Sequence, residues 1–281
     1  GSDGAGVVAA LGEGAGGLAA GDPVIINPSL DWENGPAPDH DYHCLGDPTD
    51  GTLAEFVVVP RGNLHPKPAH LDWRQAAALP LSFLTAWRAL FPVGRLQAGE
   101  RVVITGIGGG TALAGLTLAR AAGAKVAVTS RDAVKREKAL AAGADLAFES
   151  SDPWAEALRE ASGGQGADIV LETVGAPTWT QSFAALARGG RLVTYGSTGG
   201  DEVTLDLVPL FLGWRSVLGT TMGNAEDFAA MLDFVTRHRL APVIDRVFPL
   251  AEGVEALTHL DWAGQFGKVV VEMEAEQGAD F

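Results

Sequence analysis

A single cysteine in 281 residues excludes an intramolecular disulfide framework. No apolar run reaches the roughly 18 residues that a membrane-spanning helix needs. The sequence also lacks the basic and then apolar start of a secretory signal, so we expect a cytoplasmic protein with no membrane partner.

Positive charge is scarce as well. Lysine and arginine number 20 against 35 acidic residues, for a formal net charge of −15. A field of this sign repels nucleic acids and anionic membranes, which argues against both as partners. A small-molecule substrate fits this composition better.

The texture of the sequence changes part-way along the chain, which predicts two unequal domains. The first hundred residues are rich in glycine and proline, with short β-branched runs at 23–26 and 55–59 that predict an irregular β domain. From about Leu96, apolar runs alternate with helical patterns, which indicates a parallel sheet with crossover helices. Strands are expected at 101–105, 125–129, 168–172 and 191–195. A long helix is expected at 224–239, followed by strands at 244–248 and 268–272.

The most informative segment is 102–112, where an apolar strand leads through glycines into a helix. Gly106, Gly109 and Ala112 have a GxxGxxA spacing, and Gly110 and Thr111 open the helix. Glycines allow the backbone to turn tightly and approach a pyrophosphate, which the helix N-terminus attracts. The flanking strand and helix favour a dinucleotide-binding loop over an ordinary turn.

The end of the next strand indicates which dinucleotide binds. An acidic residue there would bind the ribose hydroxyls of NAD, but this strand ends in Ser130 and Arg131, with Lys135 a turn later. Hydroxyl and cationic groups suit a 2′-phosphate, so we expect NADP(H). Two alternatives stay open: the lysine belongs to a solvated helix face, or Asp132 acts as a slightly late acid.

Seven ordered segments carry a family resemblance: 3–8, 21–24, 51–56, 76–80 with 85–87, the glycine loop, 189–193 and 267–270. Together they resemble the medium-chain dehydrogenase/reductase superfamily, in its zinc-free quinone-oxidoreductase-like branch. The resemblance implies an α/β fold with a Rossmann doubly wound parallel sheet and a GroES-like β-barrel catalytic domain. It assigns 84–240 to the NADP(H)-binding Rossmann domain, and 1–83 with 241–281 to the catalytic domain. Family members carry several dozen residues before this starting point, so we expect an N-terminally incomplete catalytic domain.

The positions that carry zinc ligands in metal-dependent relatives hold Ser2 and Leu81 here. Neither side chain replaces an imidazole or a thiolate in a tetrahedral site, so we expect no zinc. His40, His43 and Cys44 lie close together in the sequence, and we interpret them as a polar loop.

The resemblance implies that the nicotinamide end of the cofactor meets several strand ends. Tyr195 could donate a proton but more simply packs, Thr85 could cap a helix, and Lys268 could instead cap a sheet edge. No general acid emerges, because Glu55 is expected to orient backbone, and the catalytic residues stay unknown. The residues implied for this end are Thr85, Val174, Gly175, Tyr195, Gly196, Ser197 and Lys268.

Without a metal to polarise a carbonyl, hydride transfer to a quinone or an α,β-unsaturated carbonyl is favoured. A zinc-free alcohol or aldehyde dehydrogenase and a catalytically silent nucleotide-binding protein are the alternatives. Residues 216–220 resemble the edge strand through which these domains pair, so we expect a homodimer.

Overall fold

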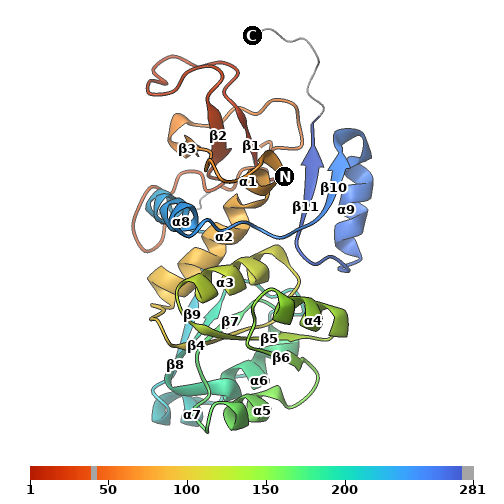
Figure 1. The fold of residues 1–281 in the computed structure, drawn as a ribbon. Helices are drawn as coiled ribbons and strands as arrows, with labels where there is room; N and C mark the ends of the chain where they lie inside the picture. Colours follow the sequence, from red (N-terminus) through yellow and green to blue (C-terminus); the bar gives the residue numbers. More distant parts are fainter. Residues whose placement is uncertain (39–42, 274–281) are drawn as a thin grey trace. The chain divides into compact units, whose positions relative to one another are not determined.

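A computed structural model of the protein describes residues 1–38 and 43–273. The chain divides into two compact units, one formed by Gly1–Leu84 with Gly223–Phe281 and the other by Thr85–Met222 (Figure 1). The contacts therefore group the segment from 223 to 240 with the first unit, whereas the sequence analysis placed it in the nucleotide-binding domain.

The second unit is built on a six-stranded parallel sheet with the strand order β6-β5-β4-β7-β8-β9. Strand order reverses between β4 and β7, and such a switch point is where open α/β sheets bind ligands. The strands are β4 (Arg101–Ile104), β5 (Lys125–Ser130), β6 (Leu146–Glu149), β7 (Ala167–Glu172), β8 (Leu186–Thr194) and β9 (Ser216–Gly219).

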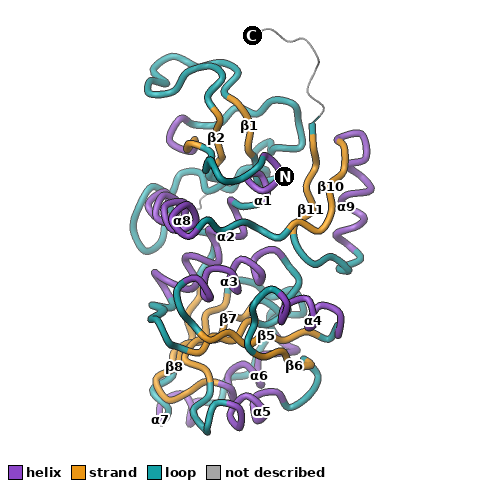
Figure 2. The backbone as a smooth tube through the Cα atoms, in the orientation of Figure 1, coloured by secondary structure: helices purple, strands orange, loops and turns teal. Residues whose placement is uncertain are grey.

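Helices cover both faces of this sheet (Figures 1 and 2). Helices α3 (Gly110–Ala121) and α4 (Ala133–Ala141) lie over one face, and α5 (Trp154–Ala161) and α6 (Ala176–Ala185) over the other. The central strands are short apolar runs because both faces are buried. On the α5 and α6 face, Trp154, Leu158, Trp179 and Phe183 join one hydrophobic cluster. Each such side chain contributes about 1.5–3 kcal/mol by its burial. Two further helical segments of this unit are the π-helix Ala89–Val93 and α7 (Leu207–Leu212). Helix α2 (Pro80–Arg88) spans the boundary between the two units.

The first unit contains two small sheets. Strands β1 (Ala5–Val7), β2 (Pro23–Ile26) and β3 (Leu64–Pro66) are antiparallel, and β10 (Ile244–Pro249) pairs in parallel with β11 (Lys268–Glu272). Helix α1 (Trp73–Ala78) contacts strands of both sheets. Helix α8 (Ala225–His238) begins at Ala225, whose N–H donates to the Trp32 carbonyl at 3.0 Å. The remaining helical segments are Arg61–Asn63, Leu250–Glu252 and α9 (Gly253–Asp261).

One expected strand is absent. Residues 55–59 form no strand, and Phe56 and Val58 are 64% and 98% exposed. The prediction was wrong because β-branched residues favour a strand only where a neighbouring strand pairs with the backbone and buries one face.

Candidate functional site

The glycine loop follows β4 at the carboxyl edge of the sheet and leads into α3. Gly106 and Gly108 have φ angles of 64° and 127°, which residues other than glycine rarely adopt. A Cβ at Gly106 would lie 2.9 Å from Val174 Cγ2, so the loop and the turn after β7 are in close contact. The first residues of α3 have no side-chain cap, and their N–H groups have no partner within the helix. This cradle fits a pyrophosphate.

Basic residues surround the end of β5. The aliphatic chain of Lys135 lies over the glycine loop, with Cδ and Nζ 2.7 and 3.3 Å from where a Cβ on Gly108 would stand. Arg131 is exposed and has no ion-pair or hydrogen-bond partner among the described residues. Ser130 is buried, and its hydroxyl accepts a bond from the Asp132 N–H at 3.1 Å. Ser130, Arg131 and Lys135 are thus brought together beside the loop.

Asp132, the alternative ribose-binding acid, caps a helix instead. Its carboxylate accepts the backbone N–H groups of Val134 and Lys135 at 2.8 and 3.3 Å. The carboxylate is therefore occupied at the start of α4, and this weakens the interpretation that it binds ribose hydroxyls.

The turns after β7 and β8 lie side by side. Backbone hydrogen bonds join them, from Gly199 N–H to the Val174 carbonyl at 2.7 Å and from Ala176 N–H to the Gly200 carbonyl at 2.9 Å. Gly175 has a φ of 86°, and a Cβ there would lie 2.1 Å from the Gly200 oxygen. The structure therefore brings the Val174–Gly175 turn and the segment 195–197, including Gly196 and Ser197, to the same edge as the glycine loop.

A buried carboxylate, Glu172, holds the first of these turns. Its Oε1 accepts the N–H groups of Val174 and Gly175 at 2.8 and 3.1 Å, and the hydroxyls of Thr105 and Thr178 at 3.0 and 2.9 Å. The Ser182 hydroxyl donates to Oε2. Bonds to a charged acceptor are stronger than neutral ones, so Glu172 fixes the turn to β4 and α6.

This role of Glu172 was not predicted from the sequence. The sequence did carry one signal, because Glu172 ends an otherwise apolar strand and lies three residues before Gly175. A carboxylate buried at such a place needs hydrogen-bond donors around it. The hydroxyl partners themselves carried no signal, because Thr105 lies 67 residues before Glu172 and the other two lie on the following helix, α6.

The Tyr195 hydroxyl is buried and has no hydrogen-bond partner among the described residues. Burial, and then the negative charge of Glu172, raise its pKa above the ordinary tyrosine value. A raised pKa makes proton release harder, so the structure favours packing over proton donation for Tyr195.

Thr85 is buried on α2, inside the helix rather than at its N-cap. Lys268, at the start of β11 in the first unit, is paired with Asp3: its Nζ lies 2.5 Å from Asp3 Oδ2. The other Asp3 oxygen accepts the Leu81 N–H at 2.6 Å. Asp3 therefore ties β11 and α2 to the N-terminal segment, a link across 265 residues that the sequence did not predict.

The expected zinc-ligand positions contain no suitable donor set. Leu81 offers only a backbone N–H, and Ser2 hydrogen-bonds to Cys44. Burial raises the pKa of the Cys44 thiol, which the Ser2 bond only partly offsets, whereas a metal ligand is a thiolate. His43 pairs with Asp31 at 3.1 Å, and His40 lies outside the described residues. Within residues 1–38 and 43–273, no group of three histidine, cysteine or acidic side chains could hold a metal ion.

Comparison with known proteins now supplies the family. Residues 1–69 match the alcohol dehydrogenase GroES-like domain, and residues 110–237 match the zinc-binding dehydrogenase family. A zinc-type alcohol dehydrogenase-like protein of Schizosaccharomyces pombe is 31% identical over 98% of this chain and 82% of its own. The chain belongs to the medium-chain dehydrogenase/reductase superfamily. It is an oxidoreductase of that type, with the α/β fold and GroES-like domain that the sequence predicted.

Other members of the superfamily differ in what they bind. Rat quinone oxidoreductase is 29% identical over 96% of this chain and 78% of its own. A solved NAD-dependent alcohol dehydrogenase is 36% identical, with a TM-score of 0.90 and coverage of 98% and 82%. A 2-octenoyl-CoA carboxylase reductase, solved with NADP and 2-octenoyl-CoA, is 31% identical, with a TM-score of 0.89 and coverage of 99% and 68%. None of the helices in the described part of the chain has the length and hydropathy to cross a membrane.

Proposed function

We propose that this protein is a zinc-independent, NADPH-dependent reductase of a quinone or an α,β-unsaturated carbonyl. The observation that carries the cofactor choice is the placement of Lys135 against the glycine loop, with Arg131 exposed at the end of β5. A guanidinium and an ammonium group beside the adenosine ribose would pair with a 2′-phosphate. The nearest acid, Asp132, is occupied in capping α4.

When bound, the cofactor would supply the hydride. The glycine loop would hold its pyrophosphate through Gly106, Gly109, Gly110 and Thr111. The paired turns, through Val174, Gly175, Tyr195, Gly196 and Ser197, would orient the nicotinamide together with Thr85. Because Glu172 locks the first turn, the ring would meet a preorganised edge rather than a mobile loop. A role of Lys268 at the cofactor stays a prediction, and the described partner of its Nζ is the Asp3 carboxylate.

Zinc independence rests on the donor chemistry at the expected ligand positions. Ser2 and Leu81 provide no imidazole or thiolate, so no residue there could polarise an alcohol through a metal. Reduction of a conjugated acceptor needs less polarisation, and rat quinone oxidoreductase is similar along almost the whole chain.

We also propose that the protein acts in the cytoplasm on a small-molecule substrate.

The experiment that tests this function is a fluorescence titration with NADPH and NADH, followed by cofactor consumption with quinones, enones and aldehydes. Removing one charge-assisted contact costs about 1.5–3 kcal/mol, so Lys135→Ala should weaken NADPH binding by about 10- to 100-fold and NADH binding far less. The matched control is Lys125→Ala, which removes the same charge at the amino end of β5. Equal loss for both cofactors, or turnover of aldehydes alone, contradicts the proposal.

We also propose that the protein forms a homodimer through β9, Ser216–Gly219, and the adjoining residue Thr220. Strand β9 lies at the edge of the sheet, and an unpaired edge favours association. Helix α7 precedes it and exposes apolar side chains, with Leu207 and Phe211 62% and 61% exposed. Phe211→Glu should therefore give a monomer in light scattering, whereas Glu137→Gln, a change on exposed α4, should leave a dimer. A wild-type monomer would refute the proposal.

A further inference from the structure

A cavity of about 480 Å³ lies at the amino-terminal edge of the six-stranded sheet. This is the edge opposite to the glycine loop: Arg101 is the first residue of β4, and Arg215 immediately precedes β9. The charged residues of its wall are four arginines and one aspartate, Arg101, Arg159, Arg188, Arg215 and Asp168. Such a surplus of positive charge is unexpected in a chain with a net charge of −15.

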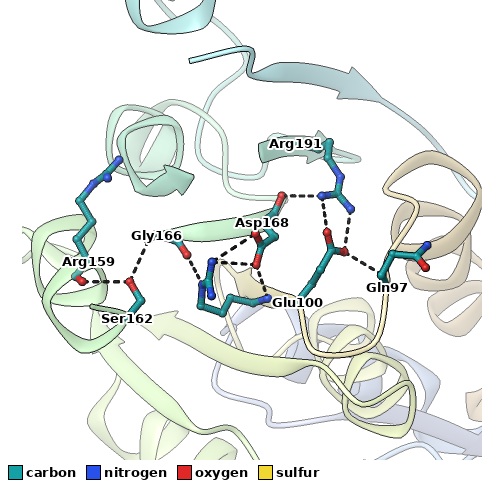
Figure 3. A network of polar contacts seen from close by, with 8 residues as sticks. Gln97, Glu100, Arg159, Ser162, Gly166, Asp168 and Arg191 are labelled. Carbon is teal, nitrogen blue, oxygen red and sulfur yellow. Dashed lines mark hydrogen bonds and ion pairs between the residues drawn. The ribbon is translucent and has the colours of Figure 1, made fainter. Parts of the chain in front are cut away.

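The acidic groups at this edge are already paired (Figure 3). Asp168 accepts the Arg101 backbone N–H at 2.8 Å and pairs with the Arg101 guanidinium at 3.2 Å. Both carboxylate oxygens of Glu100 accept from the Arg191 guanidinium, at 2.8 and 2.9 Å. These two pairs use the carboxylates of the network, and none is left for the other arginines of the cavity.

The three remaining arginines have no carboxylate partner among the described residues. Arg159 and Arg215 donate to the Leu186 carbonyl, at 3.1 and 2.7 Å. Arg188 makes one long bond to a carbonyl, at 3.4 Å, and stacks on the Trp214 ring at 3.8 Å. Their contacts are neutral carbonyl oxygens and a ring, so these three guanidinium groups carry no ion pair among the described residues.

Arg215 is the least satisfied of the three. Its Nε is buried and has no hydrogen-bond partner among the described residues. Burial, and then the positive charge of Arg159, lower the pKa of this guanidinium from its ordinary value. A bound anion beside the two guanidinium groups would offset the repulsion between them.

We propose that this cavity is a second ligand site, separate from the glycine loop, that binds a small molecule through a diphosphate group. Three guanidinium groups without a carboxylate partner match a multivalent anion, whereas a single carboxylate would leave most of the charge unpaired. The volume exceeds that of a diphosphate alone, so the ligand can carry an organic part. The site does not depend on the proposed reaction.

The test is calorimetric titration of the full chain with pyrophosphate and, separately, with ADP, at constant ionic strength. Arg188→Gln is the main variant, because Arg188 is exposed and supports little of the fold. It should bind at least one of the two probes about tenfold more weakly than the wild type. Arg188→Lys, which keeps the charge but loses the planar fork, should bind with intermediate affinity.

Two matched variants separate this site from other causes. Arg120→Gln removes the same charge from an exposed pair with Asp145 and should bind like the wild type. Lys135→Gln should leave the arginine-dependent binding intact, even where it weakens NADPH binding. Thermal unfolding without ligand checks that each variant is folded.

Three results would overturn the proposal: no binding of either probe, equal loss in Arg120→Gln, or binding that depends on Lys135 rather than Arg188. The first would show that the cavity takes no diphosphate, the second that only net charge matters, and the third that the probes occupy the glycine loop. Failure of the proposed reductase activity, by contrast, would leave the arginine-dependent binding unchanged.

Discussion

Replacement of Glu172 by glutamine tests whether this carboxylate organises the carboxyl edge of the Rossmann sheet. The side chain is fully buried, and its Oε1 accepts four hydrogen bonds, two from backbone N–H groups and two from threonine hydroxyls. Glutamine keeps the shape and one acceptor oxygen but removes the charge. Glu172→Gln therefore isolates the contribution of the charge from that of packing.

The magnitude follows from those bonds. A hydrogen bond to a charged group contributes about 1.5–3 kcal/mol, against about 0.5–1.5 kcal/mol for a neutral pair. With four bonds weakened and partly compensated by relaxation, we expect a loss of about 2–4 kcal/mol in the free energy of unfolding. Ser182→Ala, which removes one donor to Oε2, should cost less, about 1–2 kcal/mol.

The assay is urea unfolding followed by far-UV circular dichroism. Glu137→Gln serves as the matched control, because Glu137 is exposed on α4 and should change stability by less than about 0.5 kcal/mol. A Glu172→Gln variant as stable as this control would refute the reasoning, since the charge would then contribute nothing to the turn.

Three further predictions concern the same unit. Gly175→Ala should lower the free energy of unfolding in urea by at least about 3 kcal/mol, because φ is 86° and the added Cβ would lie 2.1 Å from a backbone oxygen. A variant as stable as the wild type would contradict this turn geometry. Gly108→Ala should weaken NADPH binding by about tenfold in fluorescence titration, because its Cβ displaces Lys135, and unchanged affinity would argue against that lysine's role. Burial raises the pKa of Glu100, but the Arg191 hydrogen bonds, the Gln97 N–H and the charges of Arg191 and Arg101 together outweigh it and lower the pKa below the ordinary value. The pair therefore stabilises the fold at neutral pH and loses this contribution as pH falls through the lowered pKa, so Glu100→Gln should flatten the decline in stability at acidic pH.

Much of the second unit could be predicted because local signals agree there. Residues 101–105 and 125–129 are short apolar runs between glycines and helical patterns, and both form central parallel strands. Asp132 follows β5 and caps the next helix, as its residue type favours. Agreement between propensity, periodicity and capping leaves few alternative folds.

What could not be predicted depends on contacts between distant residues. The strand β6 was missed because its four residues are only half-buried and carry weak apolar periodicity. The sequence also predicted a strand at 55–59 that does not form. Its β-branched residues favour a strand, but no neighbouring strand pairs with them. The arginine cavity and the Asp3–Lys268 pair join residues tens to hundreds of positions apart, and a single sequence carries no signal for such pairs.

The proposed activity is tested by comparing the oxidation of NADPH and NADH with a quinone and an enone, before and after treatment with a metal chelator. We expect a kcat/KM at least about tenfold higher with NADPH than with NADH, unchanged by the chelator. A preference for NADH, or activity that the chelator removes and zinc restores, would contradict it.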